Sequence, residues 1–299
     1  HEDPAMSQAH IAILADRGAI AVTGEDARHF LDNLITNDMG LLDSQDAVHA
    51  GLLTPQGKIL FEFIVIRRPE GYLIETARAA AGDLLKRLTL YRLRAKVALN
   101  DLSASRTVVA AWGVPVPELP LAVAYADPRT PALGHRLIVA PEIAAKLEAA
   151  DEGRTAYDRH RIALGVPEAG RDYQLGDAFP HEADFDRFAG VSFTKGCFVG
   201  QEVVARMQHK TLVRKRVIRI TGSAPLTSGA DIHIGTATIG RIGTVDGPDG
   251  LAMLRIDRAL EARSKGQSLT SDGATNIVAD AGSLDAYAAA AQSRAAAGT

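Results

Sequence analysis

Residues 47–67 read AVHAGLLTPQGKILFEFIVIR, and this stretch indicates the class of fold. Two runs rich in apolar and β-branched residues, AVHAGLL and KILFEFIVIR, flank the turn residues TPQG. Pro55 and Gly57 suit the second and fourth positions of a type I turn, which predicts that the two runs form an antiparallel hairpin. A second turn, PEG, leads into YLIET at 72–76, so the hairpin is predicted to continue as a meander.

Helical patterns stand on both sides of this meander. Thr23 and Asp26 resemble a capping box in front of apolar residues at helical spacing, which predicts a helix from about 24 to 36. A second helix is predicted over 77–93, because its leucines recur on one face. Helices packed on an antiparallel sheet indicate an α+β fold rather than a doubly wound nucleotide-binding fold.

The pattern changes after residue 100. Between 101 and 165, the runs TVVAAW and HRLIVA read as strands, and two helices are predicted, one from Pro141 through Ala150 and one ending at Gly165. Residues 166–193 show no lasting periodicity, and a loop of this length is uncommon in a compact domain unless it is functional or disordered. A functional role is favoured by its aromatic residues, which are Tyr173, Phe179, Phe185, Phe188 and Phe193.

Short β-like runs separated by glycine-rich turns follow Leu212, which is typical of a small barrel or sandwich. The alanine-rich end of the chain suits a helix or a frayed tail. The predicted organisation is an N-terminal α+β domain at 6–100 on which parts of 166–212 pack, a second α+β domain at 101–165, a connecting loop and helix at 166–212, a β-barrel at 213–280 and a tail at 281–299.

Composition limits the classes of function. The chain of 299 residues carries 33 basic and 36 acidic residues, a net charge of −3, so nucleic-acid binding would need a local basic patch. One cysteine excludes an internal disulfide framework and cannot by itself form a zinc or iron-sulfur site. No run approaches the roughly 18 apolar residues of a membrane helix, and HEDPAMSQAH lacks a signal-peptide pattern. We expect HEDPA to be an added segment, the native chain to start at Met6, and the protein to reside in the reducing cytoplasm of a bacterium without membrane contact.

The single cysteine stands in KGCFVGQE, residues 195–202. QEVVARMQHK reads as a helix that begins near Gly200, which places Cys197 in the loop before a helix N-terminus and two residues from Lys195. A helix N-terminus and a nearby cation both stabilise a thiolate, so Cys197 is a candidate for an accessible, reactive thiol. A free cysteine can equally be a small buried apolar residue, and spacing alone leaves both interpretations open.

The run GVSFTKGCFVGQEVVARMQHKTLVRKR, residues 190–216, resembles the signature of the YgfZ family of folate-binding, aminomethyltransferase-like proteins. Further stretches match in the right order, namely FLDNLITNDM, TPQGKIL, YRLRAKV and GVPEAGRDY. The resemblance covers most of the chain from about 10 to 260. It points to the branch that includes the mitochondrial iron-sulfur cluster assembly factors and their bacterial relatives.

This resemblance implies a fold like that of the T-protein of the glycine cleavage system, with three domains in a ring around a central folate channel and a small β-barrel as the last domain. It also implies support for the assembly or repair of [4Fe-4S] enzymes and, through them, for the thiolation of some tRNAs. The signature cysteine is tied to that activity, which marks Cys197 as the candidate catalytic residue, with Lys195 beside it. Gln201 and Glu202 carry over as signature positions in a candidate cofactor site.

Further candidate folate ligands follow from the same resemblance. In the T-protein a glutamate accepts N–H groups of the pterin, and Glu168 in GVPEAG stands at the matching place, which favours a pterin role over an exposed loop acid. Asn37 in ITND is a candidate for lining the channel. The anionic tail of tetrahydrofolate or a derivative could be received by cations that could instead bind RNA phosphates or be solvated, namely Arg206, His209, Lys210, Arg214, Lys215 and Arg216.

One segment departs from the T-protein pattern. The T-protein has paired aspartates in a G-x-I-x-D-D segment, and the equivalent GKILFE here has Phe61 and Glu62. A phenylalanine cannot act as an acid or a base, which argues against aminomethyl transfer and leaves the existence of an enzymatic reaction open. HEADFD, residues 181–186, lacks an established metal-ligand spacing, so no metal site is predicted.

The leading hypothesis is a tetrahydrofolate-binding accessory protein for iron-sulfur proteins, in which Cys197 acts as a thiol or as a partial cluster ligand beside ligands from a partner. A folate-dependent one-carbon transferase and a module that binds tRNA directly remain as alternatives. The expected partners are therefore a folate, cluster assembly proteins or client [4Fe-4S] enzymes, and, in the last alternative, tRNA.

Overall fold

The structure is a computed structural model that describes residues 9–113, 116–209 and 212–297. The described residues divide into two compact units. The first unit consists of the chain up to Leu52, Phe61–Tyr157 and Phe188–Val199, and the second consists of Leu53–Leu60, Asp158–Arg187 and the chain from Gly200 onward. The division falls within one hairpin and one helix, so neither unit is a single continuous segment.

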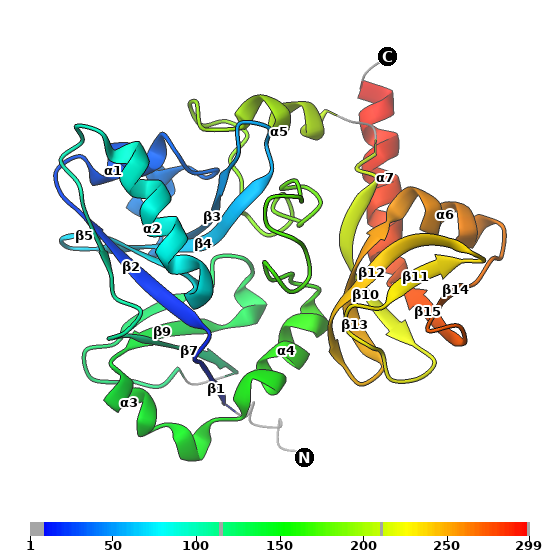
Figure 1. The fold of residues 1–299 in the computed structure, drawn as a ribbon, viewed down its shortest axis with the longest axis horizontal. Coiled ribbons are helices and arrows are strands. Elements are labelled where there is room, and N and C mark those ends of the chain that lie inside the picture. The colour runs from blue at the N-terminus through cyan, green and yellow to red at the C-terminus, as the bar shows by residue number, and fades with distance from the viewer. Residues whose placement is uncertain (1–8, 114–115, 210–211, 298–299) are drawn as a thin grey trace, which may run out of the picture. The chain divides into compact units, whose positions relative to one another are not determined.

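A five-stranded sheet holds the predicted meander (Figure 1). Its order is β3-β4-β5-β2-β6, with β3 at Ala47–Leu53, β4 at Ile59–Arg68, β5 at Gly71–Ala77, β2 at Arg17–Thr23 and β6 at Ala98–Asp101. The N–H of Gly57 donates to the carbonyl of Thr54 at 2.8 Å, which closes the turn between β3 and β4. Helix α2 (Arg78–Arg92) lies against the sheet and buries Leu84 and Leu88. The predicted hairpin, meander and second helix are therefore confirmed.

The first helix is shorter than predicted and begins in a different way. Helix α1 (Ala27–Asp32) has Asp26 as its N-cap residue, without a side-chain capping bond. Thr23 is the last residue of β2, and the carboxylate of Asp26 accepts the backbone N–H of Lys96 at 2.7 Å. The predicted capping box is therefore wrong, because Asp26 bonds to a backbone group far along the chain rather than to the first turn of the helix.

A four-stranded sheet also lies in the first unit. Its order is β1-β7-β9-β8, with β1 at His10–Leu14, β7 at Thr107–Trp112, β9 at His135–Val139 and β8 at Val123–Ala126. The two predicted strands of this region are confirmed as β7 and β9. Strand β1 pairs antiparallel with β7, so residues 10–14 extend this sheet although the predicted boundaries assign them to 6–100. Only the pairing of distant strands could reveal this.

The helices of this region start and end close to their predicted positions. Helix α3 (Pro141–Ala145) begins at the predicted proline, but it stops short of Ala150, and a 3-10 turn at Glu148–Ala150 follows it. Helix α4 (Gly153–Leu164) ends immediately before Gly165, whose φ is +71°. A positive φ is readily adopted by glycine, which is why Gly165 ends this helix as predicted.

A cluster of buried ion pairs joins the two sheets of the first unit. Glu75 of β5 is 0% exposed, and its carboxylate binds Arg17 of β2 and, at 2.5 Å, Arg136 of β9. The hydroxyl of Tyr125 on β8 donates to the same carboxylate at 3.3 Å. Burial alone would raise the pKa of Glu75, but Arg136 and Arg17 hold it below its usual range. The buried carboxylate is therefore charged and links strands of both sheets.

Residues 166–193 form neither a helix nor a strand, apart from a single bridge between Ala169 and Tyr173. The predicted irregular loop is thus confirmed. Its aromatic residues mostly pack: Tyr173 is 3% exposed and Phe185 is 0% exposed, whereas Phe193 is 42% exposed. The buried aromatic residues supply an apolar core to an irregular backbone, and a functional role for this loop stays a prediction.

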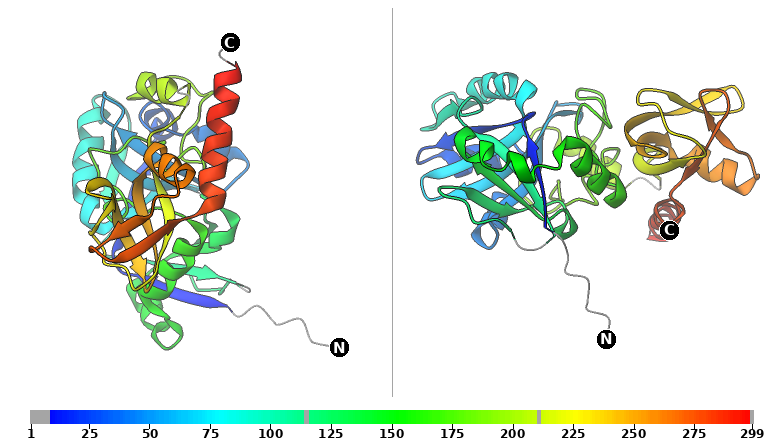
Figure 2. Two further views of the ribbon diagram at one scale, coloured as in Figure 1. Left: turned by 90° about the vertical axis from the view of Figure 1, so that its right-hand side faces the viewer. Right: turned by 90° about the horizontal axis from the view of Figure 1, so that it is seen from below.

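The second unit holds the predicted small barrel (Figures 1 and 2). It is closed and runs β10-β13-β12-β11-β14-β15, with β10 at Lys215–Gly222, β13 at Asp249–Arg255, β12 at Ala237–Asp246, β11 at Asp231–Ile234, β14 at Leu269–Ser271 and β15 at Thr275–Ala279. Helix α6 (Ile256–Ser264) contributes Ile256 and Ala259 to the apolar core of the barrel. The barrel has no free sheet edge, because closure pairs every strand on both sides.

The alanine-rich end of the chain is helical. Helix α7 (Ala281–Ala297) buries Leu284 and Tyr287 in the barrel core, so the helical alternative for the tail is confirmed. No helix within the described ranges is both long enough and apolar enough to span a bilayer.

Candidate functional site

Cys197 is exposed in the loop that leads to helix α5 (Gln201–Gln208). Gly200 caps this helix with a φ of +82°, so the helix begins where the sequence predicts. A Cβ atom on Gly196 would meet nothing within 4 Å, which means that the space beside the cysteine is open. The alternative in which Cys197 is a small buried apolar residue is therefore wrong, and the thiol is accessible.

The ammonium group of Lys195 holds a turn of the first unit. Its Nζ donates to the carbonyls of Asp32, Ile35 and Asn37 at 2.5, 3.0 and 2.8 Å. An ammonium group has three N–H donors, and these bonds use all of them. The side chain is 2% exposed, and burial lowers the pKa of Lys195 although the carboxylate of Asp32 opposes that shift. These contacts hold the Cys197 loop against the first unit, and the catalytic role of Lys195 stays a prediction.

The chain just before Lys195 is held in a similar way. Asn37 donates its two amide hydrogens to the carbonyls of His49 and Ala189, each at 2.7 Å. The hydroxyl of Thr36 donates to the next carbonyl along, that of Gly190, at 2.6 Å. The sequence predicts that Asn37 lines a folate channel, but both of its amide donors are used inside the first unit. The ITND and TKGC segments therefore form one hydrogen-bonded cradle that fixes the Cys197 loop.

Two glycines let helix α5 lie directly on the tip of the β3–β4 hairpin in the second unit. A Cβ atom on Gly200 would lie 2.7 Å from the carbonyl oxygen of Thr54, and a Cβ atom on Gly57 would lie 2.6 Å from the Cβ of Val203. Both glycines have a φ of +82°, which other residues rarely adopt. The TPQG and VGQE segments are distant in sequence, yet they form one packed element because neither glycine has a side chain.

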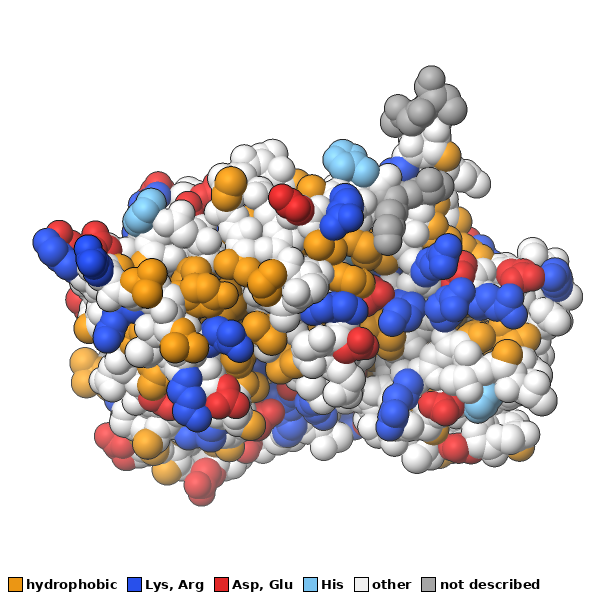
Figure 3. All heavy atoms as spheres, turned by 45° about the horizontal axis from the view of Figure 1, so that its top comes forward, with side chains coloured by type: hydrophobic (Ala, Val, Ile, Leu, Met, Phe, Trp, Pro, Cys, Tyr) orange, Lys and Arg blue, Asp and Glu red, His pale blue; other side chains and the backbone are white. Residues whose placement is uncertain are grey.

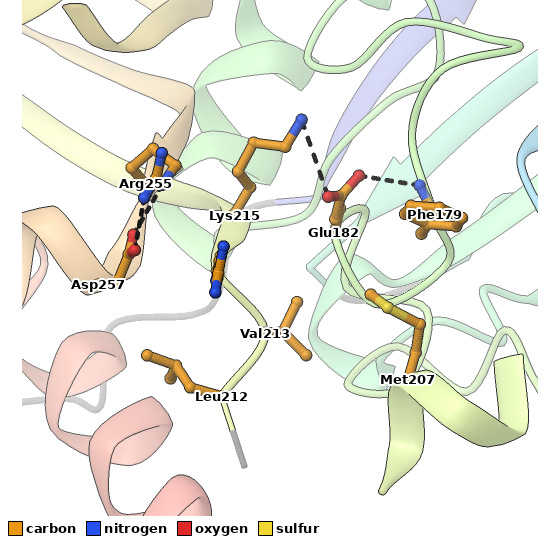
Figure 4. A pocket seen from close by; sticks show the side chains of 9 residues that line it. Phe179, Glu182, Met207, Leu212, Val213, Lys215, Arg255 and Asp257 are labelled. Atoms are coloured by element: carbon orange, nitrogen blue, oxygen red, sulfur yellow. Dashed lines mark hydrogen bonds and ion pairs between the residues drawn. The ribbon is translucent and has the colours of Figure 1, made fainter. Parts of the chain in front are cut away.

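Adjoining pockets follow helix α5 within the second unit. A pocket of about 480 Å³ lies between α5 and the hairpin tip, and it is lined by Glu202 and Arg206. Figure 4 shows a larger pocket, whose volume is about 830 Å³. Its lining also includes Arg214. The two pockets share Phe179 and Met207, so they form one groove with an apolar floor. The structure thus brings together three of the predicted cofactor-binding residues.

Two cations of this groove form no close ion pair with a carboxylate, although Arg214, after Arg255, helps to lower the pKa of Asp257. Figure 4 shows Arg255 paired with Asp257, at 2.6 Å. Among the residues that the structure describes, Arg206 and Arg214 take part in no ion pair. Lys210, which the sequence places on the same helix face as Arg206, lies outside the described residues. Figure 3 shows Lys and Arg side chains gathered in a row on the barrel side of one face.

A third pocket continues the groove toward the loop that follows helix α4. It has a volume of about 300 Å³ and shares Glu182 and Lys215 with the 830 Å³ pocket. Its lining also includes Arg171 and Asp172. The backbone N–H of Glu168 donates to Asp172 at 2.9 Å, so this end of the groove reaches the immediate neighbours of Glu168.

Glu168 belongs to a buried ion cluster. It is 5% exposed, and its carboxylate lies 3.7 Å from Arg161 and 3.7 Å from Arg171. Arg161 is 0% exposed and also binds Asp158 at 2.9 Å and Asp172 at 2.6 Å. The alternative in which Glu168 is an exposed loop acid is therefore wrong. The cluster contains three carboxylates, those of Asp158, Glu168 and Asp172, and two guanidinium groups. The two arginines therefore balance only part of its negative charge.

Phe61 and Glu62 stand in strand β4 in place of the T-protein aspartates. Phe61 is buried, and Glu62 is half-buried with a side chain that is 8% exposed. The Oε1 of Glu62 lies 2.9 Å from Nε2 of His49, and Nδ1 of His49 lies 2.9 Å from the carbonyl oxygen of Phe188. A carbonyl can only accept, so Nδ1 is the donor in the contact with Phe188. Glu62 therefore points toward His49, and the pair ties two strands to the chain that leads to Cys197.

The acidic HEADFD segment stabilises the second unit. Arg216 is 4% exposed and binds Asp184 at 2.9 Å and Asp186 at 2.8 Å. The hydroxyl of Tyr287 on α7 donates to Asp184 at 3.1 Å. Burial raises the pKa of Asp184 to about 6, although Arg216 opposes that shift. The sequence offered Arg216 as one of the cations that could receive a folate tail. The structure instead buries it in an ion pair, so it is not available to that tail.

Within the described ranges, no group of three or more His, Cys, Asp or Glu side chains is placed to hold a metal ion. The histidine of HEADFD, His181, bonds to Gln208 of α5 at 2.8 Å, and Glu182 accepts the backbone N–H of Phe179 at 3.0 Å. These side chains therefore serve the packing of α5 and of the loop at 166–193.

Several residues that hold the site were not found from the sequence. Thr36 stands next to Asn37 in the matched ITND segment, and that position was the available signal. His49 offered no signal, because it stands in an apolar strand and its partners lie at Glu62 and Phe188. Arg161 likewise reads as an ordinary charge on a helix until the loop and the barrel fold around it.

The predicted folate ligands of the second unit differ in their access to these pockets. Arg206 and Arg214 line them, and their guanidinium groups have the charge that an anionic tail requires. Glu168 lines none of the three, and its carboxylate lies 3.7 Å from both Arg161 and Arg171. Glu202 does not suit that tail, because its carboxylate lines the same pocket as Arg206. Gln201 lies in the first turn of α5 and lines none of the three pockets described.

Residues 214–281 match the family model of the C-terminal β-barrel domain of CAF17, which is the segment that forms the barrel here. The fold is similar to that of aminomethyltransferase T of the glycine cleavage system from Bartonella henselae, with a TM-score of 0.74 over 91% of this chain and 85% of that chain. Sequence identity to that protein is 17%, so this likeness concerns the fold alone. The predicted α+β fold with a C-terminal barrel is confirmed.

Two relatives are similar in sequence over most of this chain. The mitochondrial iron-sulfur cluster assembly factor IBA57 homolog of Mycosarcoma maydis is 32% identical over 253 residues, which cover 77% of this chain and 62% of the relative. The chain thus spans less than two thirds of that fungal protein. The mitochondrial iron-sulfur cluster assembly factor IBA57 of Homo sapiens is 33% identical over 287 residues, which cover 84% of this chain and 79% of the relative. With the signature around Cys197, the shared fold and the matching barrel, this chain belongs to the family of the iron-sulfur cluster assembly factor IBA57.

Proposed function

We propose that this chain acts in iron-sulfur cluster assembly through the thiol of Cys197. The observation that carries the proposal is an exposed thiol on a fixed loop: Cys197 is exposed, while Lys195 binds three carbonyls. A fixed loop presents the thiol in one place to any partner, as transfer or sharing of a ligand requires. The names of the relatives supply the process in which such a thiol would be used.

The cluster is cargo in this proposal. A [4Fe-4S] cluster is held by four cysteine thiolates, and this chain contains one cysteine. Cys197 therefore supplies a single ligand, and a cluster assembly protein or a client [4Fe-4S] enzyme supplies the others. Thiolation of tRNA follows indirectly, through clients of this kind, and the site of action is the cytoplasm of a bacterium.

Substitution of Cys197 tests this proposal. In cells that lack the protein, the Cys197→Ala variant is expected to leave a [4Fe-4S] enzyme at the activity of the empty-vector strain, because the only thiol is lost. Thr194→Ala, an exposed change in the same loop, is expected to restore the enzyme as the unmodified protein does. Full restoration by Cys197→Ala, at equal protein level, would show that the thiol is dispensable.

We further propose that the groove of the second unit binds tetrahydrofolate or a derivative. The support is that the three pockets adjoin, because each shares two lining residues with the next. Arg206 of α5 lines the pocket at one end, and Arg171, which lies 3.7 Å from Glu168, lines the pocket at the other. Glu168 would accept N–H groups of the pterin, and Arg206 and Arg214 would bind carboxylates of the tail. When bound, the folate would bring a carrier of one-carbon groups to this unit.

Calorimetric titration with tetrahydrofolate tests this second proposal. Loss of a charged hydrogen-bond acceptor in the Glu168→Ala variant is expected to weaken binding by about 10- to 100-fold. Asp231→Asn, an exposed change on strand β11, is the control and is expected to bind normally. Binding that is absent from the unmodified protein, or equal in Glu168→Ala, would refute the folate site without touching the Cys197 proposal.

A folate-dependent one-carbon transferase is less well supported than a binding role. Phe61 has no acid or base, and Glu62 is engaged with His49 at 2.9 Å. Direct binding of tRNA would instead rest on the cations seen in Figure 3. It would appear as affinity for tRNA that falls steeply as the salt concentration rises.

A further inference from the structure

Helix α1 and the end of helix α2 line a pocket in the first unit that does not include Cys197 or Lys195. Its volume is about 350 Å³. Phe30 and Leu34, which are 6% and 7% exposed, line it from α1 and the turn that follows. The chain from Tyr91 to Ala95 lines it from the other side. The pocket is therefore a small apolar depression of the size of a single large side chain.

Two leucines beside this pocket are exposed. Leu93 lines it and is 87% exposed, and Leu90, one turn earlier on α2, is 69% exposed. Single exposed leucines are common, but two next to an apolar depression form a patch of the kind that marks interaction sites. The chain itself does not cover this patch in the described structure.

The backbone of Leu93 is unusual as well. Its φ is +47°, in the region that favours glycine, which is the residue that ordinarily ends a helix. Strain alone does not indicate a site, because Leu121 has a φ of +54°, is 100% exposed and lies outside this pocket. Leu93 differs because it combines strain, exposure and a place in the pocket lining.

The charges at the pocket favour an acidic ligand. Arg92 and Arg94 line it, and Arg94 takes part in no ion pair among the described residues. Asp26 also lines the pocket, and its carboxylate accepts the backbone N–H of Lys96 at 2.7 Å, while Glu25 pairs with the ammonium of Lys96 at 2.8 Å. The lining therefore carries two guanidinium groups against one carboxylate, so a partner that brings carboxylates would meet a net positive charge.

We propose that this surface docks an acidic segment of a partner protein. A bulky apolar side chain of the segment enters the pocket over Phe30 and Leu34 and packs on Leu93. A neighbouring Asp or Glu of the segment pairs with Arg94. The proposal does not depend on Cys197 or on folate, since all of its residues belong to α1, α2 and the turns that follow them.

The test begins with a phage-displayed library of random 12-residue peptides, selected on the immobilised full-length chain. Enriched peptides are expected to combine Leu, Phe or Ile with Asp or Glu. When made with a fluorescent label, they are expected to bind the Leu93→Gly and Arg94→Glu variants about tenfold more weakly. Leu121→Gly is the matched control, because it removes a strained, exposed leucine elsewhere, and it is expected to leave the affinity unchanged.

Leu93→Gly also separates docking from folding. Its melting temperature is expected to rise, because glycine relieves the positive φ and little packing is lost, so weaker binding cannot be ascribed to unfolding. Peptides that bind Leu93→Gly and the unmodified chain equally, or enrichment of basic peptides, would overturn the proposal. Concentration-dependent dimers that Leu93→Gly abolishes would also overturn it, because they would identify a second copy of the chain as the occupant. The same holds for tRNA binding that Arg94→Glu abolishes and Leu93→Gly does not.

Discussion

The Glu75→Gln variant is expected to lose about 3–5 kcal/mol of unfolding free energy in the first unit, because two buried guanidinium groups lose their counter-charge. Glu75 is 0% exposed and binds both Arg17 and Arg136, each from a different sheet. Glutamine preserves the shape but not the charge. The measurement is urea denaturation followed by the fluorescence of Trp112, the single tryptophan, which lies on β7 of the same unit.

The pH dependence of the unfolding free energy provides a second test of Glu75. The pKa of Glu75 in the folded chain is held below its usual range, so its charge stabilises the fold at neutral pH and is lost only as the pH falls through that lowered value. The difference between the unmodified chain and Glu75→Gln is therefore expected to shrink in strong acid. Asp43→Asn, which breaks an exposed pair with Arg28, is the control and is expected to change stability little. A Glu75→Gln variant as stable as this control would contradict the assignment.

The Lys195→Met variant is expected to lose about 2–4 kcal/mol, because three carbonyl oxygens lose a charged donor. Lys195 is 2% exposed at its side chain, and methionine fills a similar volume without a donor. The cradle around Cys197 is then expected to loosen, so the variant should fail to restore a [4Fe-4S] enzyme although its thiol is intact. The measurements are the same fluorescence-detected denaturation and the assay in cells that lack the protein.

The rate of thiol alkylation separates positioning from activation by Lys195. A positioning residue predicts lower stability with a thiol that reacts with iodoacetamide at least as fast as in the unmodified chain. If Lys195 instead activates the thiol, Lys195→Met is expected to keep its stability and to be alkylated more slowly, because the thiolate of Cys197 would lose its cation. The second pattern would refute the positioning role. Lys86→Met, at a lysine whose side chain is 79% exposed, serves as the control and is expected to behave like the unmodified chain in both measurements.

Much of the fold could be predicted from local pattern. The hairpin around TPQG and the strands β7 and β9 follow from alternation and turn residues, which act over a few neighbouring positions. The same signals predict short strands after Leu212, but they leave a barrel and a sandwich open. The capping box at Asp26 and the place of β1 could not, because Asp26 bonds to Lys96 and β1 pairs with β7. Each error concerns a partner that lies far along the chain.

Some features of the candidate site could likewise be predicted from the sequence, and others could not. The KGCFVGQE signature and the helix that begins after Gly200 could be read from the residues alone, and so could the absence of an acid at Phe61. The exposure of Cys197, the three carbonyls around Lys195 and the buried setting of Glu168 became known only from the folded chain. The physical reason is that residue type and spacing specify local conformation and chemical capacity. Burial and hydrogen-bond partners, by contrast, depend on segments that only the tertiary structure brings together.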